Sequence, residues 1–99
     1  MKKITLVCAG GMSTSLMVNK MKAAAAKLEE DVEIRATAES KFKDYENDTD
    51  ILLLGPQVGF MLKKLKDTYE PKGIVVDVID SVDYGLMNGE KVLQKVLTL

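Results

Sequence analysis

Apolar residues follow two different periods in the first half of the chain. Residues 3–8 are apolar or β-branched apart from one lysine and stop at a glycine pair, which predicts a buried strand. A helical spacing begins after Ser13, carried by Met17, Met21, Ala24 and Leu28. Residues 32–38 alternate between apolar and polar positions and predict a second strand. This half therefore reads as strand, helix, strand.

The middle of the chain continues with a third strand. Ser40 is expected to cap a short helical turn through Phe42 and Tyr45, which ends at residues 48–50. Residues 51–54 are four consecutive apolar residues closed by Gly-Pro, as in a strand buried on both faces. A helical period then ends before Pro71, and its apolar positions are Val58, Leu62, Leu65 and Tyr69.

The last third predicts one more strand and one more helix. Residues 74–79 are almost entirely apolar and β-branched, so they read as the fourth strand. Residues 80–89 are expected to be a loop. A closing helix is indicated by Val92, Leu93, Val96 and Leu97.

Strands that alternate with helices predict an α/β fold in a single domain over residues 1–99. We expect a four-stranded, parallel, open sheet of order 2-1-3-4 with helices on both faces. The switch point of this order lies between the first and third strands, where ligands bind beyond the carboxyl ends of the strands. The loop after the first strand, residues 8–15, and the turn at residues 55–58 would meet there, with residues 80–84 beside them.

Composition excludes several kinds of site. The chain has no histidine and one cysteine, so we expect no histidine-based catalytic pair, no disulfide and no metal site. Net charge is −1, with five lysines and no acid in residues 1–28 and nine acids against three bases in residues 29–50. This distribution lacks the basic surface that a nucleic-acid partner requires. The first apolar run is too short for a signal peptide and no stretch is long enough to span a bilayer, so a cytoplasmic location is expected.

The loop after the first strand carries the candidate chemistry. Its nucleophile is Cys8, and the expected phosphoryl-binding residues are Ala9, Gly10, Gly11, Met12, Ser13, Thr14 and Ser15. The glycines let the backbone turn its N–H groups inward, and the helix that follows adds the positive end of its dipole. A thiolate, or a phosphoryl group on its sulfur, would be stabilised there. A buried cysteine beside an ordinary helix cap remains the alternative.

The same loop is partly similar to that of cysteine-dependent phosphatases, which have Cys, five residues, Arg, then Ser or Thr. Ser15 matches the final hydroxyl, but Thr14 stands at the arginine position. The chain's one arginine, Arg35, lies in the second predicted strand. The phosphatase pattern is therefore incomplete.

Residues 8–16, C-A-G-G-M-S-T-S-L, resemble the phosphocysteine loop C-S-A-G-M-S-T-S-L of enzyme IIB components of the bacterial phosphotransferase system, lactose/cellobiose branch. Residues 53–57, L-L-G-P-Q, and residues 78–85, V-I-D-S-V-D-Y-G, match two further motifs of that family, L-L-G-P-Q and V-I-D-S-x-x-Y-G. The departures are Ala9 for Ser and Gly10 for Ala. Three motifs at consistent spacing extend the resemblance over essentially the whole chain.

The resemblance implies a phosphocarrier role. Cys8 would accept a phosphoryl group from a phosphohistidine of enzyme IIA and pass it to a disaccharide of the cellobiose, chitobiose or lactose class held by the membrane enzyme IIC. The protein would be cytoplasmic and peripheral to the membrane through IIC, without a cofactor. Possible site-wall or partner-contact residues are Pro56, Gln57, Asp80 and Tyr84.

Two other function classes stay open at this point. One is a phosphatase-like hydrolase of low molecular weight or an arsenate reductase, which Thr14 and the single cysteine respectively oppose. In the hydrolase, Asp80 or Asp83 could supply a general acid. The other is a non-catalytic anion-binding module, which predicts that Cys8→Ser leaves function intact.

Overall fold

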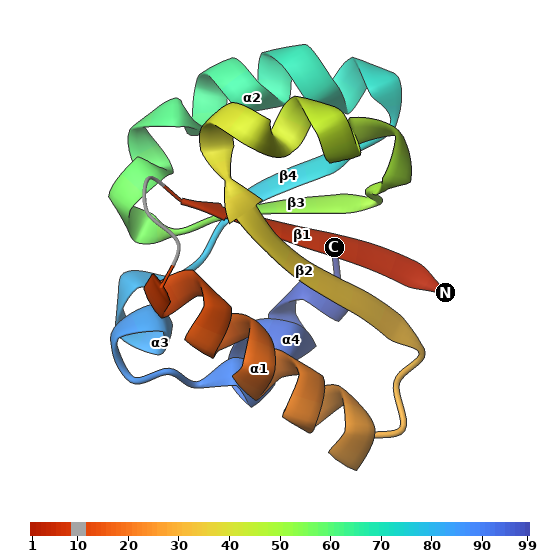
Figure 1. The fold of residues 1–99 in the computed structure, drawn as a ribbon, viewed down its shortest axis with the longest axis vertical. Helices are drawn as coiled ribbons and strands as arrows, with labels where there is room; N and C mark the ends of the chain where they lie inside the picture. Colours follow the sequence, from red (N-terminus) through yellow and green to blue (C-terminus); the bar gives the residue numbers. More distant parts are fainter. Residues whose placement is uncertain (9–11) are drawn as a thin grey trace.

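A computed structural model describes residues 1–8 and 12–99, without the side chains of Met12 and Ser13. Four strands alternate with helices along the chain (Figure 1). The elements are β1 Lys2–Cys8, α1 Met12–Lys27, β2 Val32–Ala38, the 3₁₀ helix η1 Glu39–Asp48, β3 Ile51–Leu54, η2 Pro56–Met61, α2 Leu62–Tyr69, η3 Glu70–Lys72, β4 Val75–Val78, α3 Ser81–Gly85 and α4 Gly89–Leu97.

The strands form one parallel sheet of order β2-β1-β3-β4, which confirms the predicted order. Val7 is level with Leu54, and Leu54 is level with Val78, so β1, β3 and β4 end side by side. Because the strands are parallel, the segments that follow them all leave the sheet at this one edge. The candidate residues after β1, β3 and β4 are brought together in this way.

Helices cover both faces of the sheet, as predicted (Figure 1). On one face α1, α3 and α4 close a core that includes Ile4, Leu6, Met17, Met21 and Leu93. On the other face η1, η2 and α2 close a second core that includes Val7, Phe42, Leu52, Leu54 and Leu65. The four residues of β3 are at most 2% exposed, as expected for a strand that is covered on both faces.

Three expectations about element bounds need correction. The segment before α2 is the 3₁₀ helix η2, with a kink at Val58 (φ −113°, ψ 18°), rather than the first turns of one long helix. The helical turn after β2 begins at Glu39, with Ala38 and not Ser40 at its N-cap, and it ends at Asp48, as expected. Its Phe42 packs edge-on against Tyr69 of α2, with ring centroids 5.0 Å apart. The expected loop of residues 80–89 contains α3 and the first residue of α4.

The helix α3 forms because its N-terminus is capped by its own sequence. The Asp80 carboxylate accepts hydrogen bonds from the backbone N–H groups of Val82 and Asp83, at 2.8 and 3.2 Å. Such a cap satisfies donors that the first turn of a helix leaves unpaired. A five-residue helix is too short to leave an apolar period in the sequence, which is why the segment reads as a loop.

Candidate functional site around Cys8

The cysteine lies at the carboxyl end of β1, next to the turn that follows β3. Its side chain is buried, and the adjacent Val7 carbonyl accepts a hydrogen bond from the Gly55 N–H at 2.9 Å. This bond extends the pairing of β1 with β3 by one residue and holds the Gly55 turn beside Cys8. The predicted meeting of these two segments at the switch point is therefore present.

Thr14, in the first turn of α1, contacts the cysteine directly. It is 1% exposed, and its hydroxyl donates a hydrogen bond to Cys8 Sγ. The Tyr84 hydroxyl lies 3.3 Å from the same Thr14 oxygen. Because Thr14 has one hydroxyl proton and gives it to sulfur, Tyr84 is the donor in that second bond. The two bonds thus run in one direction, from Tyr84 to Thr14 and from Thr14 to Cys8, a polarity that stabilises negative charge on the sulfur.

The turn after β3 brings Gln57 to the same place. A Cβ on Gly55 would lie 2.8 Å from Gln57 Oε1 and 3.4 Å from Cys8 Cβ. The Gln57 side chain therefore folds back over Gly55 toward the cysteine, although Gln57 itself is exposed. Pro56 opens η2 and sets the direction of this turn. The sequence motif L-L-G-P-Q thus forms one wall beside Cys8.

The two acids after β4 are engaged elsewhere. Asp80 is the cap of α3, and the Asp83 carboxylate is 3% exposed and pairs with Lys95 at 3.0 Å and Lys91 at 3.5 Å. The hydrogen bond from Lys95 is the main cause that holds the pKa of Asp83 below its ordinary value, against the opposing effect of burial. Asp83 is therefore ionised at neutral pH and has no proton to donate.

Arg35 is also committed to other partners. Its guanidinium bonds to Asp48 at 2.7 Å and to Glu33 at 3.3 Å, and it lies over the Tyr45 ring. Arg35 is level with Thr5 of β1, three residues before Cys8, or about 10 Å along the strand. The charge that a phosphatase loop requires is thus not supplied from β2.

The remaining loop residues are described only in part. Ala9, Gly10 and Gly11 lie outside the described residues. Met12 and Ser13 are described as backbone of α1 only, and Ser15 is an exposed residue of that helix. In the described part of the chain, no group of three or more His, Cys, Asp or Glu side chains could hold a metal ion.

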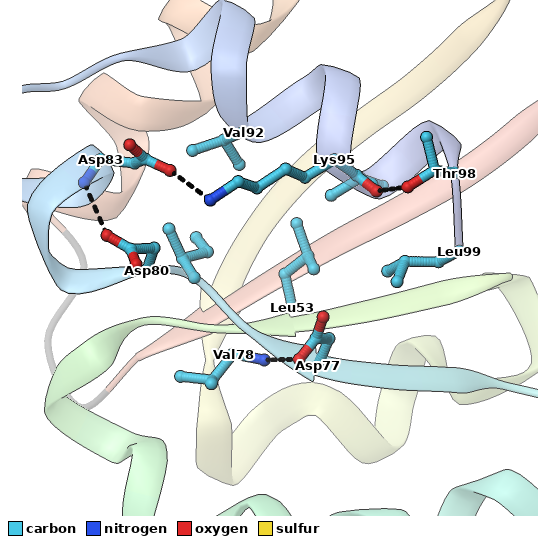
Figure 2. A pocket seen from close by; sticks show the side chains of 11 residues that line it. Leu53, Asp77, Val78, Asp80, Asp83, Val92, Lys95, Thr98 and Leu99 are labelled. Carbon is cyan, nitrogen blue, oxygen red and sulfur yellow. Dashed lines mark hydrogen bonds and ion pairs between the residues drawn. The ribbon is translucent and has the colours of Figure 1, made fainter.

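A cavity of about 180 Å³ lies between β4 and α4 (Figure 2). Asp77, Asp80, Asp83 and Lys95 are its charged lining residues, and neither Cys8 nor Thr14 borders it. The cavity is therefore separate from the thiol. Figure 2 shows the ion pair between Asp83 and Lys95 along its wall.

The lactose/cellobiose-specific IIB subunit family of the phosphotransferase system matches residues 3–95. The chain belongs to this family. An oligo-β-mannoside-specific EIIB component of Bacillus subtilis is 41% identical over 100% of this chain and 96% of its own length. A galactose-specific EIIB component of Lactococcus lactis is 46% identical, covering 93% of this chain and 90% of its own.

Solved structures agree with this assignment. The lactose-specific IIB domain of Streptococcus pneumoniae superposes with a TM-score of 0.88 at 25% identity, covering 98% of this chain and 95% of that one. A YwlE mutant from Bacillus subtilis, at 14% identity, has a TM-score of 0.62 and covers 99% of this chain and 97% of its own. The second likeness shows only that this IIB chain shares the fold of low-molecular-weight phosphatases. IIB subunits are phosphotransferase components of sugar transport systems that work with IIA and IIC partners.

Sequence reasoning missed the ion pairs of Asp83. Lys91 and Lys95 are four residues apart and share a face of α4, which was a visible signal for a common anionic partner. The sequence did not show that this partner lies in the segment after β4.

Proposed function

We propose that this IIB chain, as a single domain over residues 1–99, carries a phosphoryl group on Cys8. It would receive the group from a phosphohistidine of enzyme IIA and deliver it to a sugar held by the membrane enzyme IIC. The observation that supports this most directly is the hydrogen bond from Thr14 to Cys8 Sγ at the first turn of α1. A donor aimed at sulfur stabilises the thiolate that attacks and the thiolate that later leaves.

The transfer balances without a cofactor. Sγ attacks phosphorus, the P–N bond of the phosphohistidine breaks, and the imidazole keeps the electron pair. In the second step a sugar hydroxyl attacks phosphorus and releases its proton to solvent, and the S–P bond breaks with its electron pair left on the Cys8 thiolate. The phosphoryl oxygens would be bound by the N–H and hydroxyl groups of residues 9–15, helped by the dipole of α1.

The sugar and the location follow from the family as expectations. We expect a disaccharide of the cellobiose, chitobiose or lactose class, although relatives above 40% identity are named for oligo-β-mannoside and for galactose. Among the described helices, none has the length and apolar character needed to cross a bilayer. We place the chain in the cytoplasm, at the membrane through IIC.

The hydrolase is the second candidate, and the site opposes it on two counts. A phosphatase clamps the phosphoryl oxygens with a loop arginine and protonates its leaving group with an acid. Thr14 stands at the arginine position with no charge, and Asp83 is held ionised by Lys95. Attack on an ordinary phosphate ester therefore lacks stabilisation, whereas the P–N bond of a phosphohistidine is already activated.

One experiment separates the three function classes. The chain and its Cys8→Ser variant are incubated with phosphorylated IIA, and the adduct is located by mass spectrometry. We expect phosphate on Cys8 in the wild type, no sugar phosphorylation by Cys8→Ser, and negligible turnover of p-nitrophenyl phosphate by either. Sugar transfer that survives Cys8→Ser would favour the anion-binding module. Ester hydrolysis that disappears in Cys8→Ser would favour the hydrolase.

A further inference from the structure

The short helix α3 is held in place by two side chains. Asp83 and Tyr84 are the buried ones among its five residues, whereas Ser81, Val82 and Gly85 are exposed. A helix of this length is unstable in water by itself. Its position therefore depends on what these two side chains contact.

Asp83 docks α3 against α4 through both carboxylate oxygens. Oδ2 pairs with Lys95 Nζ at 3.0 Å and Oδ1 with Lys91 Nζ at 3.5 Å, one helical turn apart (Figure 2 shows the Lys95 contact). The lysines are more than half exposed, whereas the carboxylate is 3% exposed. A buried carboxylate with two separate partners resists rotation of α3, because turning the helix would leave a buried charge unpaired.

Tyr84, the next residue of α3, reaches Thr14 beside the thiol. Its hydroxyl donates to Thr14, and Thr14 donates to Cys8 Sγ. The contact of 3.3 Å is close to the limit for an O–H···O hydrogen bond, so a small displacement of α3 breaks it. The orientation of α3 therefore controls whether this hydrogen-bond chain is complete.

We propose that Asp83 is a positioning residue for the thiol site: by pairing with Lys95 and Lys91 it holds α3 so that Tyr84 reaches Thr14. This inference rests on the proposed function, because the position of Tyr84 serves phosphoryl transfer on Cys8. The family motif V-I-D-S-x-x-Y-G leaves the position of Asp83 open, so the motif does not assign this role. The lowered pKa of Asp83 and the raised pKa of Lys95, each caused mainly by their mutual hydrogen bond, support a pair that stays ionised at neutral pH.

The first test needs no phosphoryl donor. Ring resonances of the three tyrosines are compared by NMR in Asp83→Asn, Lys95→Met and Lys95→Arg. Glu90→Gln is the control, since it removes a different α4 ion pair, with Lys27 at 3.6 Å. We expect the ring resonances of Tyr84 to shift in Asp83→Asn and in Lys95→Met. They should stay near their wild-type positions in Lys95→Arg and in the control. Lys95→Met covers the case in which Asp83→Asn does not fold. Unchanged Tyr84 resonances in Lys95→Met would overturn the proposal.

The second test asks whether Asp83 acts through Tyr84. The rate of Cys8 phosphorylation is measured over a range of phospho-IIA concentrations up to saturation, in the wild type and in Tyr84→Phe, each with and without Asp83→Asn. We expect Asp83→Asn to slow the wild type about three- to tenfold, to slow Tyr84→Phe less than about twofold, and to leave the KM for the donor nearly constant. Equal slowing in both backgrounds would show that Asp83 only stabilises the fold and does not act through Tyr84. A wild type that accepts no phosphoryl group would refute the proposed function instead, and the tyrosine resonances would then decide the positioning role.

Discussion

At the scale of single residues, one hydroxyl distinguishes this site from that of a phosphatase. Thr14 occupies the position where the phosphatase loop has its arginine, and it donates to sulfur rather than forming a charged clamp. A neutral donor stabilises the leaving thiolate without fixing the phosphoryl group in place. This suits a carrier, which must release the group to an acceptor.

The role of Thr14 can be tested with two substitutions. Thr14→Val keeps the shape but removes the donor to Cys8 Sγ and the acceptor for Tyr84, so we expect phosphorylation of Cys8 by phospho-IIA to slow about tenfold or more. Thr14→Ser keeps the hydroxyl and should stay within about threefold of the wild type. Single-turnover rates of Cys8 phosphorylation measure both. A Thr14→Val variant as fast as the wild type would show that the hydroxyl is not used in transfer.

At the scale of elements, the backbones of α1 and α4 approach each other closely at Gly89. A Cβ on Gly89, the first residue of α4, would lie 2.5 Å from the Lys20 carbonyl carbon and 2.7 Å from the Met21 N. These are backbone atoms, which cannot move aside independently of the helix. The crossing therefore requires a residue without a side chain.

Gly89→Ala should destabilise the fold by about 1–3 kcal/mol, because the added methyl group forces the two helices apart. Gly85→Ala is the matched control, since its Cβ would meet nothing within 4 Å. There alanine should be neutral or stabilise α3 by about 0.5–1 kcal/mol. Urea unfolding measures the free energy of unfolding of Gly89→Ala and Gly85→Ala relative to the wild type. A Gly89→Ala variant as stable as the wild type would mean that α4 can shift along α1 at little cost.

The elements also show how far sequence reasoning reaches. The strand order and the meeting of Cys8 with the Gly55 turn were predictable, because buried strands and parallel topology leave strong apolar patterns. The helix α3 was missed, because five residues carry no period and its place depends on contacts with α4. That the Thr14 hydroxyl reaches the sulfur was also beyond the sequence, since side-chain rotamers decide it.

At the scale of the whole molecule, the segments that follow β1 and β3 beside the thiol carry no charge. Residues 12–19 and 54–62, which lie next to or just after the carboxyl ends of β1 and β3, contain no charged residue. Large apolar side chains are instead exposed in the segments that follow β1, β3 and β4, with Leu16, Phe60, Val82 and Leu86 between 55% and 84% exposed. The ion pairs of the described residues lie outside these two segments, as between Lys3 and Asp48 and between Asp83 and Lys95. A partner that approaches the thiol therefore meets apolar surface at these segments.

The ion pairs Lys3–Asp48 and Lys95–Asp83 make the stability of the fold depend on pH only at strongly acidic and strongly alkaline pH. Hydrogen bonds from Lys3 and Lys95 hold the pKa values of Asp48 and Asp83 below their ordinary value of 3.8. A lowered pKa contributes stability that is present above the ordinary value and is lost as pH falls through the folded value. The pKa values of Lys3 and Lys95 are raised above 10.5 by the same bonds, so their contribution is complete below 10.5 and is lost only above it. The chain has no histidine to titrate in between.

We therefore expect urea midpoints to be nearly constant between about pH 5 and 9 and to fall below about pH 4. The double variant Asp48→Asn/Asp83→Asn removes both carboxylates whose pKa is lowered, so it should be less stable at pH 7 and lose less stability on going from pH 7 to pH 3. Glu29→Gln/Glu70→Gln, at exposed positions without an ion pair among the described residues, should keep the acid dependence of the wild type. If the Asp48/Asp83 variant loses as much stability at pH 3 as the wild type, other carboxylates cause the acid dependence, and the two ion-pair clusters contribute nothing to it.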